Sequence, residues 1–408
     1  MRYRLLFLLC LAAVIAYVQR AALSVPLARI AGDLSVTNIA GDMGWVQSAW
    51  YLGYASMQIP SGWLADRYGS RLALAIYCTA WSIMTLLSGF ATDYWSLLIT
   101  WGLMGCAQAG IFPCATKAVA QTFPDSERAR ASGMLSFGMY AGTALGPLIT
   151  GLLLSYFSWP GPTDWRACLT LFAIPGLLWS LAFLESISIR DLPVQNTTGP
   201  AERIDWARLL SSPPLVLLFV QQFLRAGAMV FFITWFPMYL QQARGVSVGN
   251  SGVLTFYAAV GGMLGSLLGG FASDAILKYT GNRRLSRQGI AIAGTASCAV
   301  LALLSYFIED KNLAIAVISL GAFCATFGGV SAYTMAIELG GKQVTTVFGA
   351  MNMFGNIGAM LFPVTVGWLV AATGNWNLAL FLFASIMAVA ALCWIKLNPK
   401  QLPGGELS

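Results

Sequence analysis

Apolar runs long enough to cross a lipid bilayer recur along the whole chain and limit its fold more than any other feature. Roughly 18 or more apolar residues in a row are typical of a transmembrane helix. Hydrophobic residues make up 58% of the 408 residues and charged residues only 10%. The pattern predicts an all-α polytopic membrane protein with twelve spans. Their approximate limits are 4–28, 43–65, 71–92, 95–123, 129–156, 167–187, 213–243, 249–276, 287–307, 312–338, 343–373 and 376–396.

A long polar stretch, residues 188–212, divides the spans into two groups of six. We therefore expect an N-terminal six-helix bundle over residues 1–187 and a C-terminal six-helix bundle over residues 213–408. The stretch between them is predicted to be a cytoplasmic linker. Its second part could form a short amphipathic helix along the membrane surface.

The basic residues lie mainly in alternate segments between the spans. With the N-terminus inside, most of them fall in inside segments, and the outside segments hold Arg29, Arg166, Arg244 and Lys311. Because basic loops face the cytoplasm, both termini are predicted to be cytoplasmic in a plasma (inner) membrane. The net charge of +7 then reflects topology and excludes nucleic-acid binding. The first span is longer than the apolar region of a signal peptide, so we expect it to be retained.

Several chemistries are excluded by the residue inventory. The chain has no histidine, and its eight cysteines form no CxxC pair, so we expect neither a metal site nor a bound cofactor. The spans contain no pair of nucleophile and base at mid-membrane depth. An enzyme is therefore not expected. A receptor that binds without transporting is disfavoured because the cytoplasmic segments are short.

The two halves of the chain repeat each other's motifs. The sequence GWLADRYGSR, residues 62–71, follows the second span, and GFASD, residues 270–274, follows the eighth. The fifth and eleventh spans share one spacing of glycine and proline: Gly142, Pro147 and Gly151, then Gly358, Pro363 and Gly367. Two parallel six-helix halves are typical of transporters with a substrate site between repeats.

The motif at residues 62–71 resembles the signature of the major facilitator superfamily. Within it, the chain is similar to the anion:cation symporter family, through YVQRAALS in the first span, TWFPMYL in the seventh and MNMFGNIGAMLFP in the eleventh. The resemblance implies a twelve-helix fold, a small organic-anion substrate and alternating access by a monomer in the lipid bilayer. It also implies a cytoplasmic gate, to which Glu338, close to Lys342, is added as a candidate. The predicted gate residues are Asp66, Arg67, Arg71, Asp274 and Glu338.

Three basic residues lie inside predicted spans, where ionisable groups are rare and usually functional. Arg20 and Arg225 lie near mid-membrane depth, and every acid of the chain falls in a loop or at the end of a span. A guanidinium matches a carboxylate bidentately, so both are predicted to bind substrate. The alternative is a structural arginine held by backbone carbonyls or glutamines. Lys117 lies near the cytoplasmic end of its span and could simply snorkel.

The resemblance extends the predicted substrate site to further polar residues. Arg20 is similar to the family's carboxylate ligand, and Arg225 to an arginine of the vesicular glutamate-type members. The other candidates fall on or near cavity positions of the family, although helix packing would also explain such residues. These candidates are Tyr17, Gln19, Gln47, Tyr54, Gln108, Tyr333, Asn352 and Asn356.

The chain departs from the family where bacterial members carry proton-coupling acids. Gln19 replaces an aspartate, Gln108 a glutamate and Trp101 an arginine. Glutamine keeps a similar shape but cannot titrate, so uniport or exchange is predicted. The alternative is a proton- or sodium-coupled symporter that uses other residues. The substrate stays open among dicarboxylates, sugar acids, amino-acid anions and phosphorylated compounds.

Overall fold

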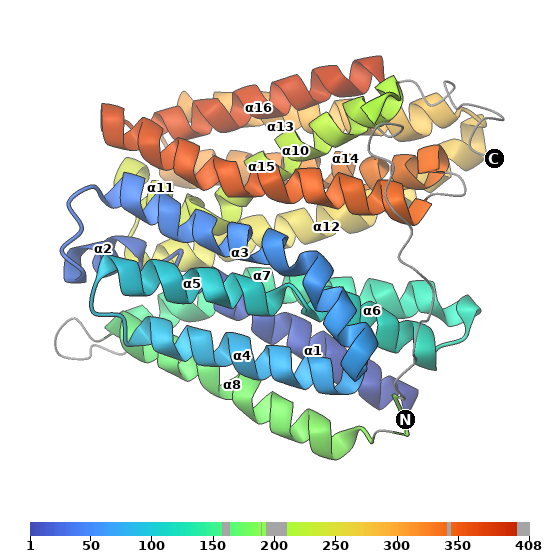
Figure 1. Ribbon diagram of the computed structural model, residues 1–408. Helices are drawn as coiled ribbons and strands as arrows, with labels where there is room; N and C mark the ends of the chain where they lie inside the picture. Colours follow the sequence, from blue (N-terminus) through green and yellow to red (C-terminus); the bar gives the residue numbers. More distant parts are fainter. Residues whose placement is uncertain (157–163, 189, 193–209, 341–343, 398–408) are drawn as a thin grey trace. The chain divides into compact units, whose positions relative to one another are not determined.

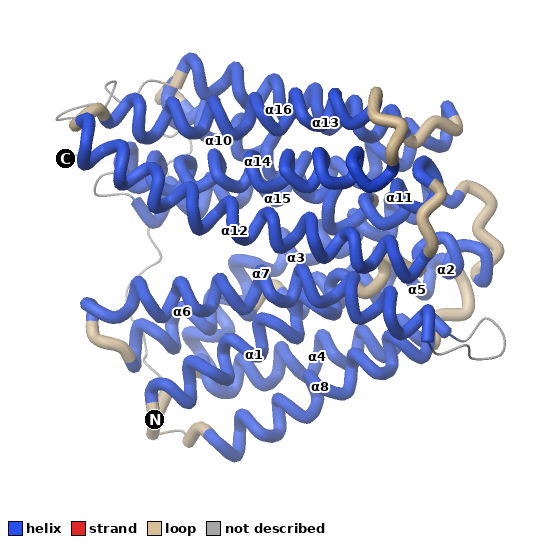
Figure 2. The backbone as a smooth tube through the Cα atoms, turned by 180° about the vertical axis from the view of Figure 1, so that it is seen from behind, coloured by secondary structure: helices blue, strands red, loops and turns tan. Residues whose placement is uncertain are grey.

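The computed structural model describes residues 1–156, 164–188, 190–192, 210–340 and 344–397. In this part of the chain the secondary structure is entirely helical, as Figure 2 shows by its colours. The all-α prediction is confirmed. The amphipathic helix predicted in the linker falls largely on residues 193–209, which lie outside the described residues.

The helices of the first half follow the predicted spans closely (Figure 1). They are α1 (Arg2–Ala21), α2 (Leu27–Asp33), α3 (Ile39–Tyr68), α4 (Ser70–Gly89), α5 (Tyr94–Gln108), α6 (Ile111–Thr122), α7 (Asp125–Tyr156) and α8 (Asp164–Ser186). Two predicted spans are each divided. The first ends as α1 before the short α2, and the fourth is broken between α5 and α6.

The helices of the second half likewise match the remaining spans. They are α10 (Pro213–Thr234), α11 (Phe236–Arg244), α12 (Val248–Thr280), the π-helical turn η1 (Leu285–Gly289), α13 (Ile290–Tyr306), α14 (Lys311–Gly340), α15 (Val344–Thr373) and α16 (Asn377–Lys396). The seventh predicted span is divided into α10 and α11, and Pro237 stands at the start of α11. Proline is favoured there because the first turn of a helix needs no amide donor.

Eleven helices of the described part are long and apolar enough to cross a membrane. The second predicted span lies in α3, which is not among these eleven. This helix has 30 residues and so runs for about 45 Å at 1.5 Å per residue, which is long enough to cross. Its lower hydropathy comes from its amides, aromatic residues and terminal charges, several of which belong to the site described below.

The chain divides into two compact units, one formed by residues 1–200 and 233–256 and the other by residues 201–232 and 257–408. The first unit therefore includes α11 and the start of α12. The side-chain amide of Gln241 on α11 donates to the carbonyl of Val25 and to the hydroxyl of Ser251, each at 3.0 Å. A Cβ added at Gly252 on α12 would lie 2.3 Å from the carbonyl oxygen of Pro147 on α7. These contacts join residues 233–256 to the first unit.

Small residues set the helix packing inside each unit. In the first unit α1 packs on α7, where a Cβ at Gly142 would lie 2.5 Å from the carbonyl oxygen of Val14. In the second unit a Cβ at Gly294 of α13 would lie 2.5 Å from the carbonyl oxygen of Cys324 on α14. Such close backbone approach is typical of helices that associate in a bilayer. The site residues on α1 and α3 are held by this framework.

A capping box at Asp93 precedes helix α5, at the N-terminal end of the candidate membrane span. The carboxylate of Asp93 accepts from the backbone amide of Ser96 at 3.0 Å, and the Ser96 hydroxyl accepts from the backbone amide of Asp93. The hydrogen bond from the Ser96 amide lowers the pKa of Asp93 from its ordinary value. The start of α5, and with it the position of Trp101 further along, is therefore fixed locally.

Candidate functional site

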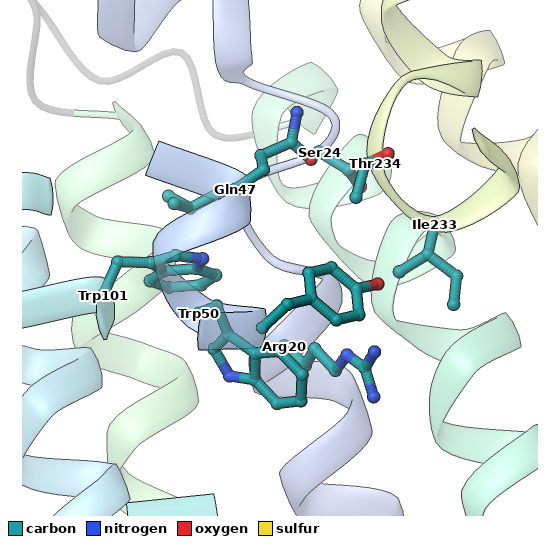
Figure 3. A pocket seen from close by; sticks show the side chains of 9 residues that line it. Arg20, Ser24, Gln47, Trp50, Trp101, Ile233 and Thr234 are labelled. Carbon is teal, nitrogen blue, oxygen red and sulfur yellow. The ribbon is translucent and has the colours of Figure 1, made fainter. Parts of the chain in front are cut away.

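The first unit contains a pocket built around Arg20, which stands in the last turn of α1. It is formed where α1 ends, by the middle of α3 and α5 and by the end of α10. Figure 3 shows the guanidinium of Arg20 beside the indole of Trp50. The lining residues are Arg20, Leu23, Ser24, Gln47, Trp50, Tyr51, Trp101, Ile233 and Thr234.

Three aromatic rings surround the guanidinium of Arg20. Its central carbon lies 3.8 Å from the ring centroid of Trp50, 4.8 Å from that of Tyr51 and 5.4 Å from that of Tyr17. Aromatic faces attract a cation through their quadrupole, and the interaction is strongest for tryptophan. The N–H donors of a guanidinium lie in its plane, so contacts with its faces leave the donors for a ligand. Arg20 is thus held by aromatic side chains.

No carboxylate of the described side chains forms an ion pair with Arg20. That no internal acid accompanies this arginine stays a prediction. Around it, three buried nitrogen atoms have no hydrogen-bond partner among the described residues: Arg20 Nε, Gln47 Nε2 and Trp50 Nε1. The Tyr51 hydroxyl interacts with the Arg20 side chain and keeps its own hydrogen for a ligand. Each of these atoms can donate a hydrogen bond.

The unpartnered donors are deeply buried, which makes their lack of a partner costly. Gln47 is 5% exposed, Trp50 2% and Tyr51 3%. A buried polar group without a hydrogen bond costs about 1–3 kcal/mol, and nearly all such groups in folded proteins are satisfied. An acceptor that enters this pocket would recover that cost. The chemistry that fits a cation with neighbouring donors is an oxyanion.

Two predicted tyrosines support the pocket from behind its lining. The Tyr54 ring stacks on Trp50 with centroids 4.9 Å apart and planes 19° apart. The Tyr17 ring lies near Arg20, as described above. The Cβ of Tyr17 is 2.7 Å from the position that a Cβ added at Gly142 would take. Neither tyrosine is among the lining residues. The structure therefore brings Arg20, Gln47, Tyr17 and Tyr54 together, and their contact with substrate stays a prediction.

The two predicted glutamines, Gln19 and Gln108, lie between packed helices. Gln19 is fully buried, donates to the carbonyl of Phe172 at 2.6 Å and to Ser82 at 3.4 Å, and accepts from Thr85 at 3.4 Å. Gln108 donates to the carbonyl of Ala16 at 3.0 Å. Neither lines the Arg20 pocket. These bonds tie α1 to α4, α5 and α8, and a role of either amide in substrate binding stays a prediction.

The second predicted arginine lies in the second unit, on α10. Arg225 is 9% exposed, and one of its terminal nitrogens donates to the side-chain oxygen of Gln222 at 3.0 Å. A Cβ at Gly329 on α14 would lie 2.7 Å from its other terminal nitrogen, so the guanidinium lies against the backbone there. Its Nε has no partner among the described residues. Arg225 thus has a glutamine partner and an unsatisfied donor.

The remaining predicted site residues also lie in the second unit, on α14 and α15. The side-chain amide of Asn356 donates to the carbonyl of Asn352 at 3.1 Å, one turn earlier. Tyr333 is 38% exposed, and its ring lies 5.6 Å from that of Phe348. A Cβ at Gly355 would lie 3.3 Å from the Gln222 side chain, so α15 packs beside the partner of Arg225.

The predicted gate residues of the first half lie at the ends of α3 and α4. Arg71 donates to the carbonyls of Leu184 at 2.6 Å and of Ile187 at 2.5 Å, and so caps the end of α8. Arg67 is exposed, 5.7 Å from the Tyr68 ring. The side chain of Asp66 lies outside the described part. Arg71 therefore has a structural partner, and its role in gating stays a prediction.

The predicted gate residues of the second half share one arginine. Arg287 in η1 pairs with Glu338 of α14 at 3.1 Å and with Asp274 of α12 at 3.5 Å, and it donates to Ser273 at 2.6 Å. Lys342, the partner predicted for Glu338, lies outside the described residues. Arg287 was not among the predicted gate residues. The π-helical turn carries it back between α12 and α14.

Several residues of the Arg20 pocket were not predicted. Trp50 and Tyr51 fall in an aromatic run with Tyr54, and Trp101 was noticed only as a departure from the family. Ser24, Ile233 and Thr234 carry no signal in the sequence, because they enter the pocket only through packing. Lys117 is partly buried on α6 and is not among the lining residues. The sequence signal that could have found this pocket is the aromatic run Trp50, Tyr51 and Tyr54 in the span that follows the one with Arg20.

Comparison with known proteins gives a consistent family. The sequence profile of the Major Facilitator Superfamily matches residues 9–336. The probable sulfoacetate transporter SauU of Cupriavidus necator is 28% identical, over 98% of this chain and 94% of the relative. The hexuronate transporter of Bacillus subtilis is also 28% identical, over 95% of this chain and 92% of the relative.

Solved structures show the same fold. A bacterial homologue of the human lysosomal transporter Spinster matches with a TM-score of 0.81 at 18% identity, over 98% of this chain and 97% of that one. The D-xylose–proton symporter matches with a TM-score of 0.77 at 14% identity, over 97% of this chain and 98% of that one. At these identities the likeness concerns the arrangement of helices alone.

Proposed function

Because the chain belongs to the Major Facilitator Superfamily, we propose that it carries small organic anions across a membrane by binding them at Arg20. The relatives described above are named for sulfoacetate and hexuronate, both of which are organic anions. Helices of the two halves rock about the site and expose it to each side in turn. The protein acts as a monomer in the inner membrane, with both termini in the cytoplasm.

The observation that carries this proposal is the place of Arg20 among other buried donors that lack an acceptor. No described carboxylate is paired with it. Arg20 Nε and the buried donors of Gln47, Trp50 and Tyr51 await an acceptor. In a carrier, that acceptor arrives with the substrate and leaves again. An internal carboxylate would compete for the same guanidinium.

We further propose that transport is uniport or exchange. Gln19 donates to the carbonyl oxygen of Phe172 at 2.6 Å, and Gln108 to that of Ala16 at 3.0 Å. An ionised carboxylate has no hydrogen to donate to a carbonyl, so an amide suits both places. A permanent amide cannot carry a proton through the cycle. The alternative is a proton- or sodium-coupled symporter that relies on other residues.

Arg225 is proposed as a second cationic contact for the anion, provided from the second half. Its unpartnered Nε and its burial support this role. The cytoplasmic gate is proposed to involve Asp66, Arg67 and Arg71 of the first half, and Asp274 and Glu338 of the second half. The ion pairs of Arg287 with the last two residues support a latch at that end of the second unit.

Counterflow in liposomes tests the proposal. Purified protein is reconstituted into vesicles loaded with unlabelled sulfoacetate or glucuronate, and entry of the labelled anion is followed without an imposed proton gradient. We expect uptake by the native protein and its loss in Arg20→Ala and Arg20→Lys, because a lysine offers no planar fork of donors.

The exposed Arg4 on the same helix provides the control, since Arg4→Lys keeps its charge away from the pocket. Uptake by Arg20→Lys at the native rate, in protein with native thermal stability, would contradict the assignment of Arg20.

A further inference from the structure

We propose that the Arg20 pocket selects compact organic anions whose carbon body carries few hydroxyl groups over hydroxyl-rich sugar acids. The inference rests on the proposed function and narrows the substrate class of the same site. It follows from the kind of hydrogen-bonding groups that the pocket offers, from its walls, and from the residue at position 101.

The pocket offers donors in excess of acceptors. Its buried donors without an acceptor among the described residues are Arg20 Nε, Gln47 Nε2, Trp50 Nε1 and the Tyr51 hydroxyl, of which only the hydroxyl can also accept. The lining side chains also hold acceptor oxygens in Gln47, Ser24 and Thr234, fewer than the donor hydrogens, and the Ser24 hydroxyl donates to the carbonyl of Ala21 at 2.7 Å. An oxyanion has only acceptors and satisfies donors of this kind, so the anionic end of a substrate is well matched.

A substrate hydroxyl has the opposite requirement, because it brings a hydrogen that needs an acceptor. Each hydroxyl buried without one costs about 1–3 kcal/mol. An open-chain sugar acid carries several such groups next to its carboxylate and cannot turn all of them toward water in a closed site. The excess of donors therefore favours the anion and penalises each hydroxyl.

The walls of the pocket are apolar and aromatic. Trp50, Tyr51 and Trp101 are 2%, 3% and 3% exposed, and Leu23 and Ile233 complete the lining. Aromatic walls would also accept the apolar face of a sugar ring, but an open-chain polyol has no such face. The surroundings of Arg20 thus match methylene groups better than a row of hydroxyls.

Trp101 makes the pocket singly charged. Of the lining residues Arg20 alone carries a charge. The indole of Trp101 fills a wall position with an apolar surface and a single donor. A second guanidinium there would have drawn in further oxygens. With tryptophan at this position, one anionic group is bound at Arg20, and the substrate carbons next to that group meet the apolar wall of the pocket.

Carbon-matched pairs of anions test the inference on the purified full-length protein. The pairs are propionate and glycerate, succinate and tartrate, and ethanesulfonate and isethionate, with galactonate as a hydroxyl-rich reference. Thermal stabilisation and inhibition of counterflow are measured for each. We expect the member without hydroxyls to bind at least about fivefold more tightly in each pair, the lower limit for one unsatisfied hydroxyl.

The outcomes separate this inference from the proposed function. If glycerate, tartrate or isethionate binds as tightly as its hydroxyl-free partner or more tightly, or if galactonate binds as tightly as the hydroxyl-free anions, the specificity is wrong while the organic-anion function stands. If no anion of the panel stabilises the protein or competes while sulfoacetate or glucuronate is still taken up, the specificity alone is overturned. If neither of those two anions is taken up either, both are overturned.

Variants at Trp101 locate the preference. Trp101→Gln adds an uncharged acceptor and Trp101→Arg adds a cation, and both are expected to reduce the preference for the hydroxyl-free member by at least about threefold. Trp101→Phe keeps the apolar wall and should keep the preference. Trp95→Phe on the same helix, at a tryptophan that is 67% exposed, is the control. An unchanged preference in folded Trp101→Gln would overturn the assignment to this wall.

Discussion

Arg20 illustrates how aromatic side chains hold a charged residue inside a helical membrane protein. Its guanidinium lies 3.8 Å from the Trp50 centroid and is flanked by Tyr51 and Tyr17. Such contacts contribute about 0.5–2 kcal/mol each, more when water is excluded. They hold the side chain in place and leave its donors for an anion. A tight ion pair would also have held the side chain, but it would have occupied the donors that an anion needs.

Trp50 is therefore expected to matter for affinity as well as for packing. Trp50→Leu removes the face on which Arg20 rests and should weaken anion binding by roughly 2–30-fold, whereas Trp50→Phe should retain most of the affinity. The measurement is the concentration of unlabelled anion that half-inhibits counterflow. Trp95→Leu, at an exposed tryptophan of the same protein, serves as a control. Equal affinities of Trp50→Leu and the native protein would show that the ring does not position the guanidinium.

Gln19 shows the limit of reading a site residue by residue. The sequence places it beside Arg20, and helical geometry turns adjacent residues to different faces. Arg20 reaches the pocket, while Gln19 meets Phe172, Ser82 and Thr85 in the interior of the first unit. The missing acid near Arg20 could be predicted by placing every carboxylate along the chain. The side on which each neighbour would lie could not, because it depends on how α1 packs against α4 and α8.

Removal of the Gln19 amide should lower stability more than it alters affinity. Interhelical side-chain hydrogen bonds in membranes contribute about 0.6 kcal/mol on average and at most about 1.7, so Gln19→Leu should lower the melting temperature measurably. The affinity for the transported anion in the folded fraction should stay unchanged. A loss of affinity at native stability would instead support the original prediction that Gln19 contacts the substrate.

At the scale of helices, the breaks within spans were the hardest feature to predict. Residues 95–123 form one apolar run, yet α5 ends at Gln108 and α6 begins at Ile111. A Cβ at Gly110 would lie 2.2 Å from the Tyr77 ring, so the break occurs where a neighbouring helix presses on the chain. Hydropathy reports that a segment can cross the membrane. It does not report which turn of the helix must yield to a partner.

Helix α7 offers a matched test of close packing, because two of its glycines differ only in their surroundings. A Cβ at Gly142 would lie 2.5 Å from the carbonyl oxygen of Val14 on α1, while one at Gly133 would have nothing within 4 Å. Gly142→Ala should destabilise the protein by about 1–3 kcal/mol. Gly133→Ala should be neutral or stabilising by up to about 1 kcal/mol, from helix propensity. Thermal unfolding of the two variants in the same detergent measures the difference, and equal melting temperatures would rule out tight contact between α1 and α7.

For the whole molecule, the order of apolar runs and the repeated motifs predicted the architecture, and the family match agrees with it. The two compact units are not continuous in sequence, however, because residues 233–256 belong to the first unit. Gln241 bonds to Val25, and Gly252 packs against Pro147. No local pattern in α11 or α12 announces this exchange, since it depends on contacts between residues far apart in sequence. Ile233 and Thr234 reach the Arg20 pocket for the same reason.

The mode of transport is a property of the complete cycle, and the two amides at positions 19 and 108 lead to its prediction. With no proton carried by these residues, counterflow should keep the same rate in symmetric buffers across about pH 6–8, where glutamine does not titrate. Uniport of an anion moves net charge, and a membrane potential of 100 mV contributes about 2.3 kcal/mol per charge. If the protein is a uniporter, a potential that is positive inside the vesicle should therefore increase uptake of the anion. If it exchanges anions of equal charge, the potential should leave the rate of uptake unchanged. If a protonophore abolishes accumulation that an imposed pH gradient had driven, the carrier is a symporter, and protons then pass through residues other than Gln19 and Gln108.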